Sequence, residues 1–207
     1  MGREIRDLTP ANLDDLPHPC RACIFWELSP VDRAGCVTQD AVEFEKEAWC
    51  SEVALVSGSC GKVAYLDGRP VGYVIFGPRE QFGGAEVFPA RVSKDALLLS
   101  VAYVLPNASG WGIGKALVHA VLAETTKRGK KAVEAYGDRK WEHPACLLPA
   151  SFLEILGFKV KRDHPRFPLM RIDARSLAKV SQTVESAVEQ LLDSLKGPEP
   201  AVRPAGY

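Results

Sequence analysis

The stretch that decides the fold covers residues 107–117 and reads NASGWGIGKAL. Glycine occupies positions 110, 112 and 114, directly before an apolar run with helical spacing. Unpaired backbone N–H groups at the start of a helix attract anions, because the helix dipole places partial positive charge there. The absence of side chains at Gly112 and Gly114 lets a bulky pyrophosphate approach the backbone. The stretch therefore predicts an anion-binding loop.

Two common nucleotide-binding loops do not fit this stretch. A Walker loop, GxxxxGK[ST], needs glycine at 109 and a hydroxyl residue at 116, but the chain has Ser109 and Ala116. A dinucleotide fingerprint, GxGxxG, that starts at Gly110 needs a third glycine where Lys115 stands, and no acidic residue closes a following strand to bind a ribose. The sequence therefore excludes a P-loop and a Rossmann site, and it disfavours a nucleoside-triphosphate enzyme.

The segments around the loop are typical of a strand, a helix and a second strand. Residues 96–104 (ALLLSVAYV) form an almost unbroken apolar run, as expected for a central strand buried on both faces. Residues 112–128 keep helical spacing and are followed by a glycine stop, and residues 132–136 form the next strand-like run. This order predicts a βαβ-like crossover with the loop at the carboxyl end of the first strand, where α/β sheets bind ligands.

Weaker patterns outline the rest of the chain. Asp67-Gly68 lies between strand-like runs at 62–66 and 71–76 and is a strong hairpin signal. The prolines and the Gly83-Gly84 pair within residues 77–94 predict a long functional loop. Further expected elements are a strand within 2–8, a helix over about 40–56 with Phe44, Ala48, Val53 and Ala54 among its apolar positions, a short helix at 150–156, and late strands at 158–160 and 169–172.

The end of the chain predicts an additional amphipathic helix. Residues 176–196 carry one apolar stripe at helical spacing. This stripe either docks on its own domain or pairs with a second subunit in a homodimer, and the pattern leaves both open. We therefore divide the chain into a domain over 1–172, a C-terminal helix over 173–196 and a flexible tail over 197–207.

Composition limits the kinds of partner. The 207 residues are 46% hydrophobic and 25% charged, and 26 Lys and Arg balance 26 Asp and Glu. A formal net charge of zero gives no global field toward nucleic acid or an anionic membrane, so we expect neither partner. The charged amino-terminal residues resemble neither a signal peptide nor a membrane span, and we expect a cytoplasmic protein.

The six cysteines favour reduced thiols over a disulfide framework in a domain of this size. Cys20 and Cys23 form a CxxC motif with His18 just before it and Cys36 further along. A zinc site can be drawn from these residues, but no second CxxC or histidine pair stands at ligand spacing. We therefore expect no bound metal.

In its context the loop resembles the cofactor loop of the GNAT superfamily of N-acetyltransferases, V-x-P-x-x-[RQ]-G-x-G-[IA]-G. Residues 104–114 (VLPNASGWGIG) match it at every position except Ser109, where the family has Arg or Gln. A second family element, F-[YL]-E-x-L-G-F, is present at 152–158 as FLEILGF. The two elements occur in the family's order with a strand between them, and the resemblance spans roughly residues 60 to 172.

The resemblance implies an α/β (α+β) fold with a mixed, splayed sheet flanked by helices, and acetyl-CoA as cosubstrate. The pantetheine would follow Ala102, Tyr103 and Val104, and the backbone N–H near Ala102 would polarise the acetyl carbonyl, which contributes roughly 2–4 kcal/mol. An amine would then attack directly, without a protein nucleophile. The pyrophosphate would lie on the backbone of Ser109, Gly110, Trp111, Gly112, Ile113, Gly114 and Lys115.

The residues that move protons depart from the family pattern. The family's glutamate base aligns with Leu98, and its thiolate-protonating tyrosine aligns with Leu153. A carboxylate must therefore take the place of the missing base, and another group must take the place of the missing acid. A chain of water molecules could also perform either proton transfer. The candidate bases are Asp95, then Glu134 and Glu86, and the candidate acids are Tyr136 and Cys146.

The predicted function is transfer of an acetyl group to a primary amine of a protein lysine or a small molecule. Trp26, Glu27 and the residues around 80–86 would border the amine, and carboxylates there would suit a cationic acceptor. The alternative is a catalytically silent CoA-binding sensor or interaction module, which the loss of both customary side chains favours.

Overall fold

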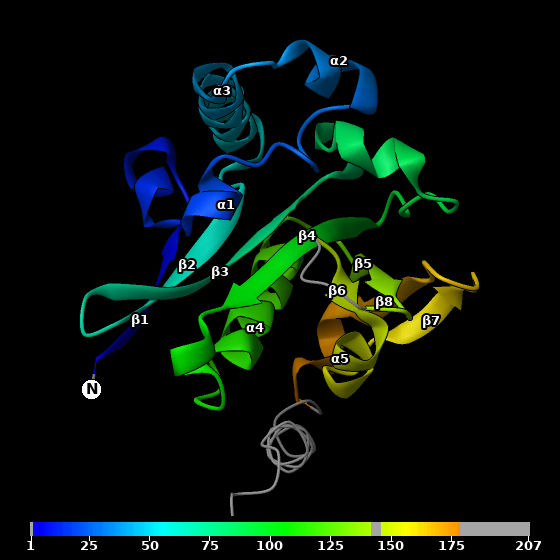
Figure 1. Ribbon diagram of the computed structural model, residues 1–207. Helices are drawn as coiled ribbons and strands as arrows, with labels where there is room; N and C mark the ends of the chain where they lie inside the picture. The colour runs from blue at the N-terminus through cyan, green and yellow to red at the C-terminus, as the bar shows by residue number, and fades with distance from the viewer. Residues whose placement is uncertain (1, 142–145, 179–207) are drawn as a thin grey trace, which may run out of the picture.

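The computed structural model describes residues 2–141 and 146–178 (Figure 1). These residues form one eight-stranded sheet in the order β1-β2-β3-β4-β5-β8-β7, with β6 paired to β5. The mixed sheet flanked by helices confirms the predicted fold class. The strands are β1 (Arg3–Asp7), β2 (Gly61–Leu66), β3 (Arg69–Gly77), β4 (Ala96–Val104), β5 (Ala132–Asp138), β6 (Leu148–Pro149), β7 (Lys159–Arg162) and β8 (Leu169–Asp173).

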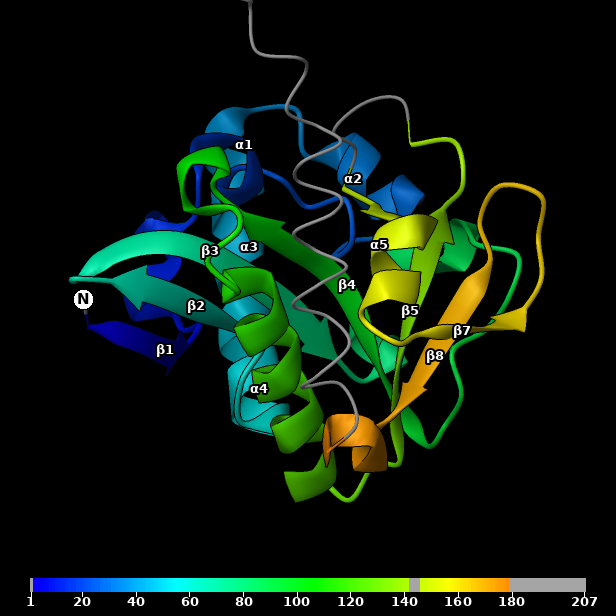
Figure 2. The same ribbon diagram turned by 90° about the horizontal axis from the view of Figure 1, so that it is seen from below.

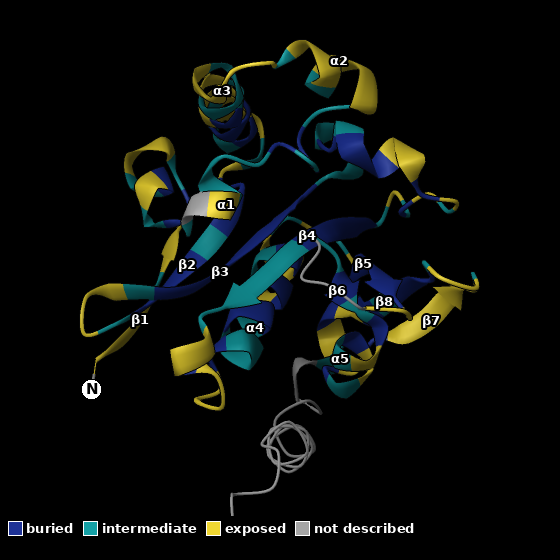
Figure 3. Cartoon of the chain, viewed as in Figure 1, coloured by how far each residue is buried: buried dark blue, intermediate teal, exposed yellow. Residues whose placement is uncertain are grey.

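Helices cover both faces of the sheet (Figures 1 and 2). The helix α3 (Gln39–Ser57) lies over one face, and α4 (Ile113–Lys127) and α5 (Ala150–Ile155) lie over the other. The buried sides of α3 and α4 face the sheet and their outer sides are exposed (Figure 3). The shorter helices are η1 (Pro10–Asp15), α1 (His18–Arg21), α2 (Pro30–Gly35), η2 (Arg79–Gln81), η3 (Gly83–Val87), η4 (Pro106–Ala108) and η5 (Ala174–Ala178).

The parallel pair β4 and β5 is joined over a short length. Three residue pairs, from Ala96↔Ala132 to Leu98↔Glu134, connect the two strands. Beyond them β4 continues to Val104 and β5 to Asp138 without pairing to each other. The two strands therefore splay into a wedge that opens toward their carboxyl ends, as the family resemblance implies.

The strand β6 pairs with the end of β5, where β4 is no longer paired with β5. It pairs in parallel with Gly137 and Asp138 of β5. On the opposite edge of β5, the backbone N–H of Gly137 donates to the Pro168 carbonyl at 3.0 Å, and that of Arg139 donates to the Arg166 carbonyl at 3.0 Å. Because that edge is taken, β6 lies on the edge that faces β4, inside the wedge.

The helix over residues 40–56 is confirmed, but only Val53 of the four apolar positions named from the sequence is buried. Phe44 is 69% exposed, whereas Trp49, Cys50 and Val53 pack on the sheet. Lys46 lies on this inner face and is buried. A charged residue takes the inner face because Glu27, far away in the sequence, neutralises it there.

The segment 77–94 differs from a simple surface loop because it contains the 3₁₀ helices η2 and η3. The backbone N–H groups of Gly83 and Gly84 donate to the carbonyls of Glu27 and Trp26 at 3.1 and 3.0 Å. A side chain does not fit at Gly84, since a Cβ atom there would lie 2.0 Å from the Phe25 carbonyl oxygen. The two glycines therefore dock the segment against residues 25–29.

This docking predicts a large stability effect at one glycine. Gly84→Ala is expected to lower the free energy of unfolding by about 1–3 kcal/mol, because the backbone must move to admit the methyl group. Gly35→Ala is the matched control, since a Cβ atom at Gly35 meets nothing within 4 Å. Urea unfolding followed by circular dichroism measures both variants, and equal midpoints would contradict the packing described above.

The hairpin at Asp67-Gly68 is confirmed, with both residues at positive φ between β2 and β3.

The expected C-terminal helix and tail lie almost wholly outside the described residues, which end with η5. Within the described residues, no helix is both long enough and apolar enough to cross a membrane.

Candidate active site

The glycine loop connects β4 to α4 and contains two backbone conformations that favour glycine. Gly110 has φ of 84°, and Gly112, the N-cap residue of α4, has φ of 70° and ψ of 14°. Both lie in the left-handed region, where a Cβ atom is costly for most residues. Arg3 of β1 holds the turn from outside, because its Nη2 donates to the Trp111 carbonyl at 2.6 Å.

The loop presents a run of backbone donors. The first bond of α4 runs from the Ala116 N–H to the Gly112 carbonyl at 3.0 Å. Within the described part of the chain, the N–H groups of residues 110–114 donate to no other residue. They lie at the positive end of a 15-residue helix. This arrangement has the backbone features that the sequence predicts for an anion-binding cradle, and we refer to residues 110–114 as the cradle.

Gly114 links the cradle to the wedge. A Cβ atom at this position would lie 3.6 Å from Val104 at the end of β4 and 3.7 Å from Phe152 of α5. The glycine thus sits between the two elements that border the wedge on the α4 side. Lys115 and Ile113 lie in the same first turn, the former half-buried and the latter buried, while the side chains of Ser109 and Trp111 are exposed.

The strand β4 contains a bulge just before the part of the strand that borders the wedge. The register with β3 shifts between Ile75 and Phe76, which leaves Ser100 without a Cα partner. The Ser100 hydroxyl instead donates to the Ile75 carbonyl at 3.1 Å. After the bulge, Ala102 packs toward the α4 face and Tyr103 toward the α3 face, and β4 is only half-buried to its end. The sequence gives no sign of this bulge.

The structure brings Asp95 and Glu134 together through Arg171. The Arg171 guanidinium binds both oxygens of Asp95 at 3.0 Å and one oxygen of Glu134 at 2.9 Å. Lys161 lies 2.6 Å from the same Glu134 oxygen. The backbone N–H of Ser93 donates to the other oxygen at 2.9 Å. Both carboxylates are therefore engaged, at the closed end of the wedge.

The two carboxyl groups have lowered pKa values. The hydrogen bonds from Arg171 lower the pKa of Asp95. Burial raises the pKa of Glu134, but hydrogen bonds from Lys161, from the Ser93 backbone and from Arg171 outweigh it and hold that pKa below its usual range. A carboxylate with a lowered pKa is a weak base, so this environment favours an ion-pair role for both residues.

These shifts predict acid lability. Because a lowered folded-state pKa contributes stability above the unfolded pKa, that stability is lost as the pH falls below the ordinary carboxyl pKa of about 4 and through the folded value. Urea unfolding at pH 6 and pH 3.5 is expected to show a smaller difference for Glu134→Gln than for the unmodified protein. Glu86→Gln, at an exposed carboxylate outside the cluster, is expected to keep the full difference. An unchanged difference in Glu134→Gln would refute the role of this cluster.

The two candidate acids lie on the α3 face. The Tyr136 hydroxyl donates to the Ala90 carbonyl at 2.5 Å, and burial raises its pKa to about 12. Its ring stacks on Phe88 at 4.3 Å between centroids, and Phe88 in turn stacks on Trp26 at 5.1 Å. The Cys146 Sγ lies 3.6 Å from the Cys23 Sγ, just before β6 enters the wedge.

Some of the residues expected near the acceptor amine are buried and others are exposed. Trp26 and Glu27 are both buried, and Glu27 forms an ion pair with Lys46. Glu80 and Glu86 are exposed on the docked segment. Among these carboxylates, Glu27 is thus neutralised inside the protein, and the exposed pair is solvated.

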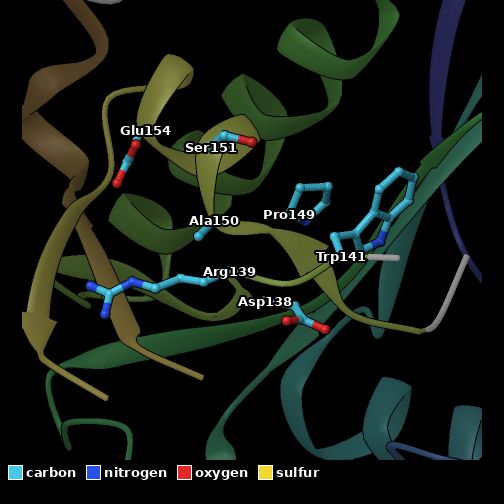
Figure 4. Close-up of a pocket in the computed structure, with 7 residues that line it drawn as sticks. All are labelled: Asp138, Arg139, Trp141, Pro149, Ala150, Ser151 and Glu154. Atoms are coloured by element: carbon cyan, nitrogen blue, oxygen red, sulfur yellow. The ribbon is translucent and has the colours of Figure 1, made fainter. Parts of the chain in front are cut away.

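Two hollows adjoin the wedge region. One of about 470 Å³ lies at the carboxyl end of β5, and Figure 4 shows its lining side chains. The other, of about 190 Å³, lies beside the end of β4. Asp138, Arg139, Trp141, Pro149, Ala150, Ser151 and Glu154 line the first, and Asp15, Pro17, Pro70, Gly72, Tyr73, Tyr103 and Leu105 line the second.

The CxxC motif does not assemble a metal site with other described residues. No group of three or more His, Cys, Asp or Glu side chains in residues 2–141 and 146–178 is arranged to hold a metal ion. The thiols of all six cysteines are free.

Comparison with known proteins identifies the class of the protein. The model of the family described as "Acetyltransferase (GNAT) family" matches residues 24–158, well over half of the chain. The protein is thus an acyltransferase by class, and the chain belongs to the GNAT acetyltransferase family. The family resemblance predicted from the loop is confirmed. No curated protein matches the chain by sequence.

Solved structures share the fold at low sequence identity. PaiA N-acetyltransferase from Thermoplasma acidophilum, in complex with coenzyme A, is 18% identical with a TM-score of 0.55, covering 84% of this chain and 99% of that chain. The putative acetyltransferase YncA from Salmonella typhimurium, with its cofactor acetyl-CoA, is 20% identical with a TM-score of 0.56, covering 84% and 95%. An N-acetyltransferase from Staphylococcus aureus Mu50 is 18% identical with a TM-score of 0.55, covering 84% and 99%.

Proposed function

We propose that the protein binds acetyl-CoA and transfers its acetyl group to a primary amine by direct attack. The observation that carries this proposal is the run of backbone N–H groups at residues 110–114, at the mouth of the wedge between β4 and β5, which donate to no other residue among those that the structure describes. Such a cradle suits a pyrophosphate. Similar folds are described in complex with coenzyme A and with acetyl-CoA, which supports the same cosubstrate here.

The residues that would hold the cosubstrate line a continuous path. The cradle would take the pyrophosphate, and Gly114 leaves room between Val104 and Phe152 for the chain that follows. The open edge of β4 after Ser100 would offer backbone groups to the pantetheine amides, as a neighbouring strand would. Acetyl-CoA supplies the activated thioester, and the backbone N–H near Ala102 remains our candidate for polarising its carbonyl.

Proton transfer would depend on water and on groups along the α3 face. Asp95 and Glu134 stay candidates for the base, but their ion pairs with Arg171 oppose that role. We infer that the ammonium proton of the acceptor leaves through water. Cys146 and Tyr136 both stay candidates for the acid that protonates the departing thiolate. Each already has a partner, because the tyrosine hydroxyl donates to the Ala90 carbonyl and the Cys146 Sγ lies 3.6 Å from the Cys23 Sγ.

The acceptor would approach from the α3 face. The smaller hollow lies there beside Tyr73 and Tyr103, which form a tilted ring pair with centroids 5.9 Å apart. Asp15 lines the same hollow and is its acidic group. Aromatic rings and a carboxylate suit a cationic amine with an apolar stem, such as a lysine side chain or a polyamine.

A silent CoA-binding module is the second candidate function. It is favoured by Leu98 and Leu153, which are fully buried at the positions where the family carries its base and acid. Such a protein would keep the cradle and lack turnover.

One experiment separates these functions. The purified full chain is titrated calorimetrically with acetyl-CoA, CoA and ATP, and thiol release is then followed with lysine peptides, polyamines and small neutral or acidic amines. Binding with amine-dependent thiol release is the expected result. Binding without release for any amine would favour the silent module, and failure to bind acetyl-CoA would refute both.

A further inference from the structure

Two cysteines meet at the α3 side of the wedge although they are far apart in the sequence. Cys23 follows α1, and Cys146 precedes β6, the strand that lies inside the wedge. Their sulfur atoms are 3.6 Å apart across a separation of 123 residues. Both residues are partly accessible. The pair therefore spans the gap between the amino-terminal segment and the wedge.

Buried side chains fix the backbone of both cysteines. Lys46 Nζ donates to the Cys23 carbonyl at 3.0 Å, and the ion pair with Glu27 holds Lys46 in place. Trp26 Nε1 donates to the Cys146 carbonyl at 2.7 Å. A disulfide requires a sulfur separation of about 2.05 Å, so the two side chains must approach each other from 3.6 Å while the backbone on either side is held in place.

The two thiols are chemically unequal. The contact between the two sulfur atoms lowers the pKa of Cys23, while the same contact and burial raise the pKa of Cys146. Among the described residues, Cys20, Glu27 and Lys46 are the other charged or titratable groups that act on Cys23. A thiolate beside a protonated thiol is the arrangement in which one sulfur attacks and the other resolves the product.

We propose that Cys23 and Cys146 form a thiol–disulfide exchange site for low-molecular-weight disulfides, which closes into a reversible Cys23–Cys146 disulfide. The Cys23 thiolate attacks one sulfur of the small disulfide, whose S–S bond breaks and releases one thiolate that takes a proton from water. Cys146 then loses its proton and attacks the Cys23 sulfur, which releases the second small thiol. Two protein thiols are oxidised by two electrons, and one small disulfide is reduced to two thiols.

The chain contains its own control pair. Cys50 and Cys60 lie closer together, with sulfur atoms 3.0 Å apart, but both are fully buried. Proximity without access should not permit exchange with a dissolved disulfide, because the attacking thiolate must reach it. The proposal therefore assigns reactivity to the accessible pair and inertness to the closer one.

The test treats the reduced, folded full chain with oxidised glutathione and maps its cysteines by peptide mass spectrometry without reduction. The expected product is a Cys23–Cys146 cross-linked peptide that dithiothreitol reverses, with Cys50 and Cys60 still reduced. Cys146→Ser is expected to stop at a mixed disulfide on Cys23, Cys23→Ser to prevent the cross-link, and Cys50→Ser to leave it unchanged. Circular dichroism before treatment establishes that each variant is folded.

Thermal unfolding gives a second readout. Because the new bond closes a long loop, oxidation is expected to raise Tm by at least about 5 °C in the unmodified protein and in Cys50→Ser. A Cys20–Cys23 disulfide, glutathione on Cys36 alone, or no product would each overturn the proposal. None of these results depends on acetyl transfer.

Discussion

Gly112→Asp is expected to weaken acetyl-CoA binding by roughly 100-fold while leaving the protein folded. The substitution places a carboxylate where the pyrophosphate is expected, and like charges about 4 Å apart repel by several kcal/mol near a protein surface. The fold should tolerate it, because a Cβ atom at Gly112 meets nothing within 4 Å. Aspartate also adopts the left-handed conformation of this N-cap more readily than most residues. Calorimetric titration measures the affinity.

Gly112→Asn is the matched control, since asparagine has the same shape and the same tolerance of positive φ without the charge. It is expected to lose far less affinity than the aspartate variant. Equal affinities in Gly112→Asp and the unmodified protein, with unchanged circular dichroism, would refute the assignment of the cradle. Equal losses in both variants would mean that shape rather than charge governs this position.

Lys46→Ala is expected to lower the free energy of unfolding by about 3–5 kcal/mol, because it leaves Glu27 as an uncompensated buried charge. Both side chains of this pair are nearly inaccessible, with 3% of Lys46 and 2% of Glu27 exposed. The variant also removes the hydrogen bond to the Cys23 carbonyl. Urea unfolding at neutral pH measures the loss.

Two variants test whether the buried charge is the cause. Lys127→Ala, at an exposed lysine 4.0 Å from Glu124, is expected to change stability by less than about 1 kcal/mol. The double variant Glu27→Gln, Lys46→Met is expected to recover much of the loss, since it removes both charges together. A double variant as unstable as Lys46→Ala would attribute the effect to lost packing instead.

The centre of the fold follows closely from the sequence because its signals are local. The apolar run at residues 96–104 coincides with β4, and the glycine loop and helix that follow begin where their spacing predicts. The hairpin at Asp67-Gly68 is equally local, since two residues at positive φ fix its turn. These elements place the cradle at the wedge, and the family resemblance depends on them.

The rest of the site depends on contacts between distant residues. Glu134 follows a strand pattern that places it beside Tyr136, but its ion pairs come from Lys161 and Arg171, which no local pattern connects to it. The same holds for Lys46 and Glu27, and for the docking of Gly83 and Gly84 on residues 25–29. The sequence therefore predicts the position of the glycine loop better than the contacts of the groups proposed to move protons.

The short joint between β4 and β5 divides the sheet into two parts. The strands β1 to β4 form one antiparallel meander-like unit, and β5, β7 and β8 form the other. Three residue pairs of β4 and β5 and the helix α4 connect them, together with side-chain contacts such as that of Arg171 with Asp95. We expect local opening between these parts to cost less free energy than global unfolding. A ligand bound across the wedge, as proposed for acetyl-CoA, is then expected to slow amide exchange in both parts at once.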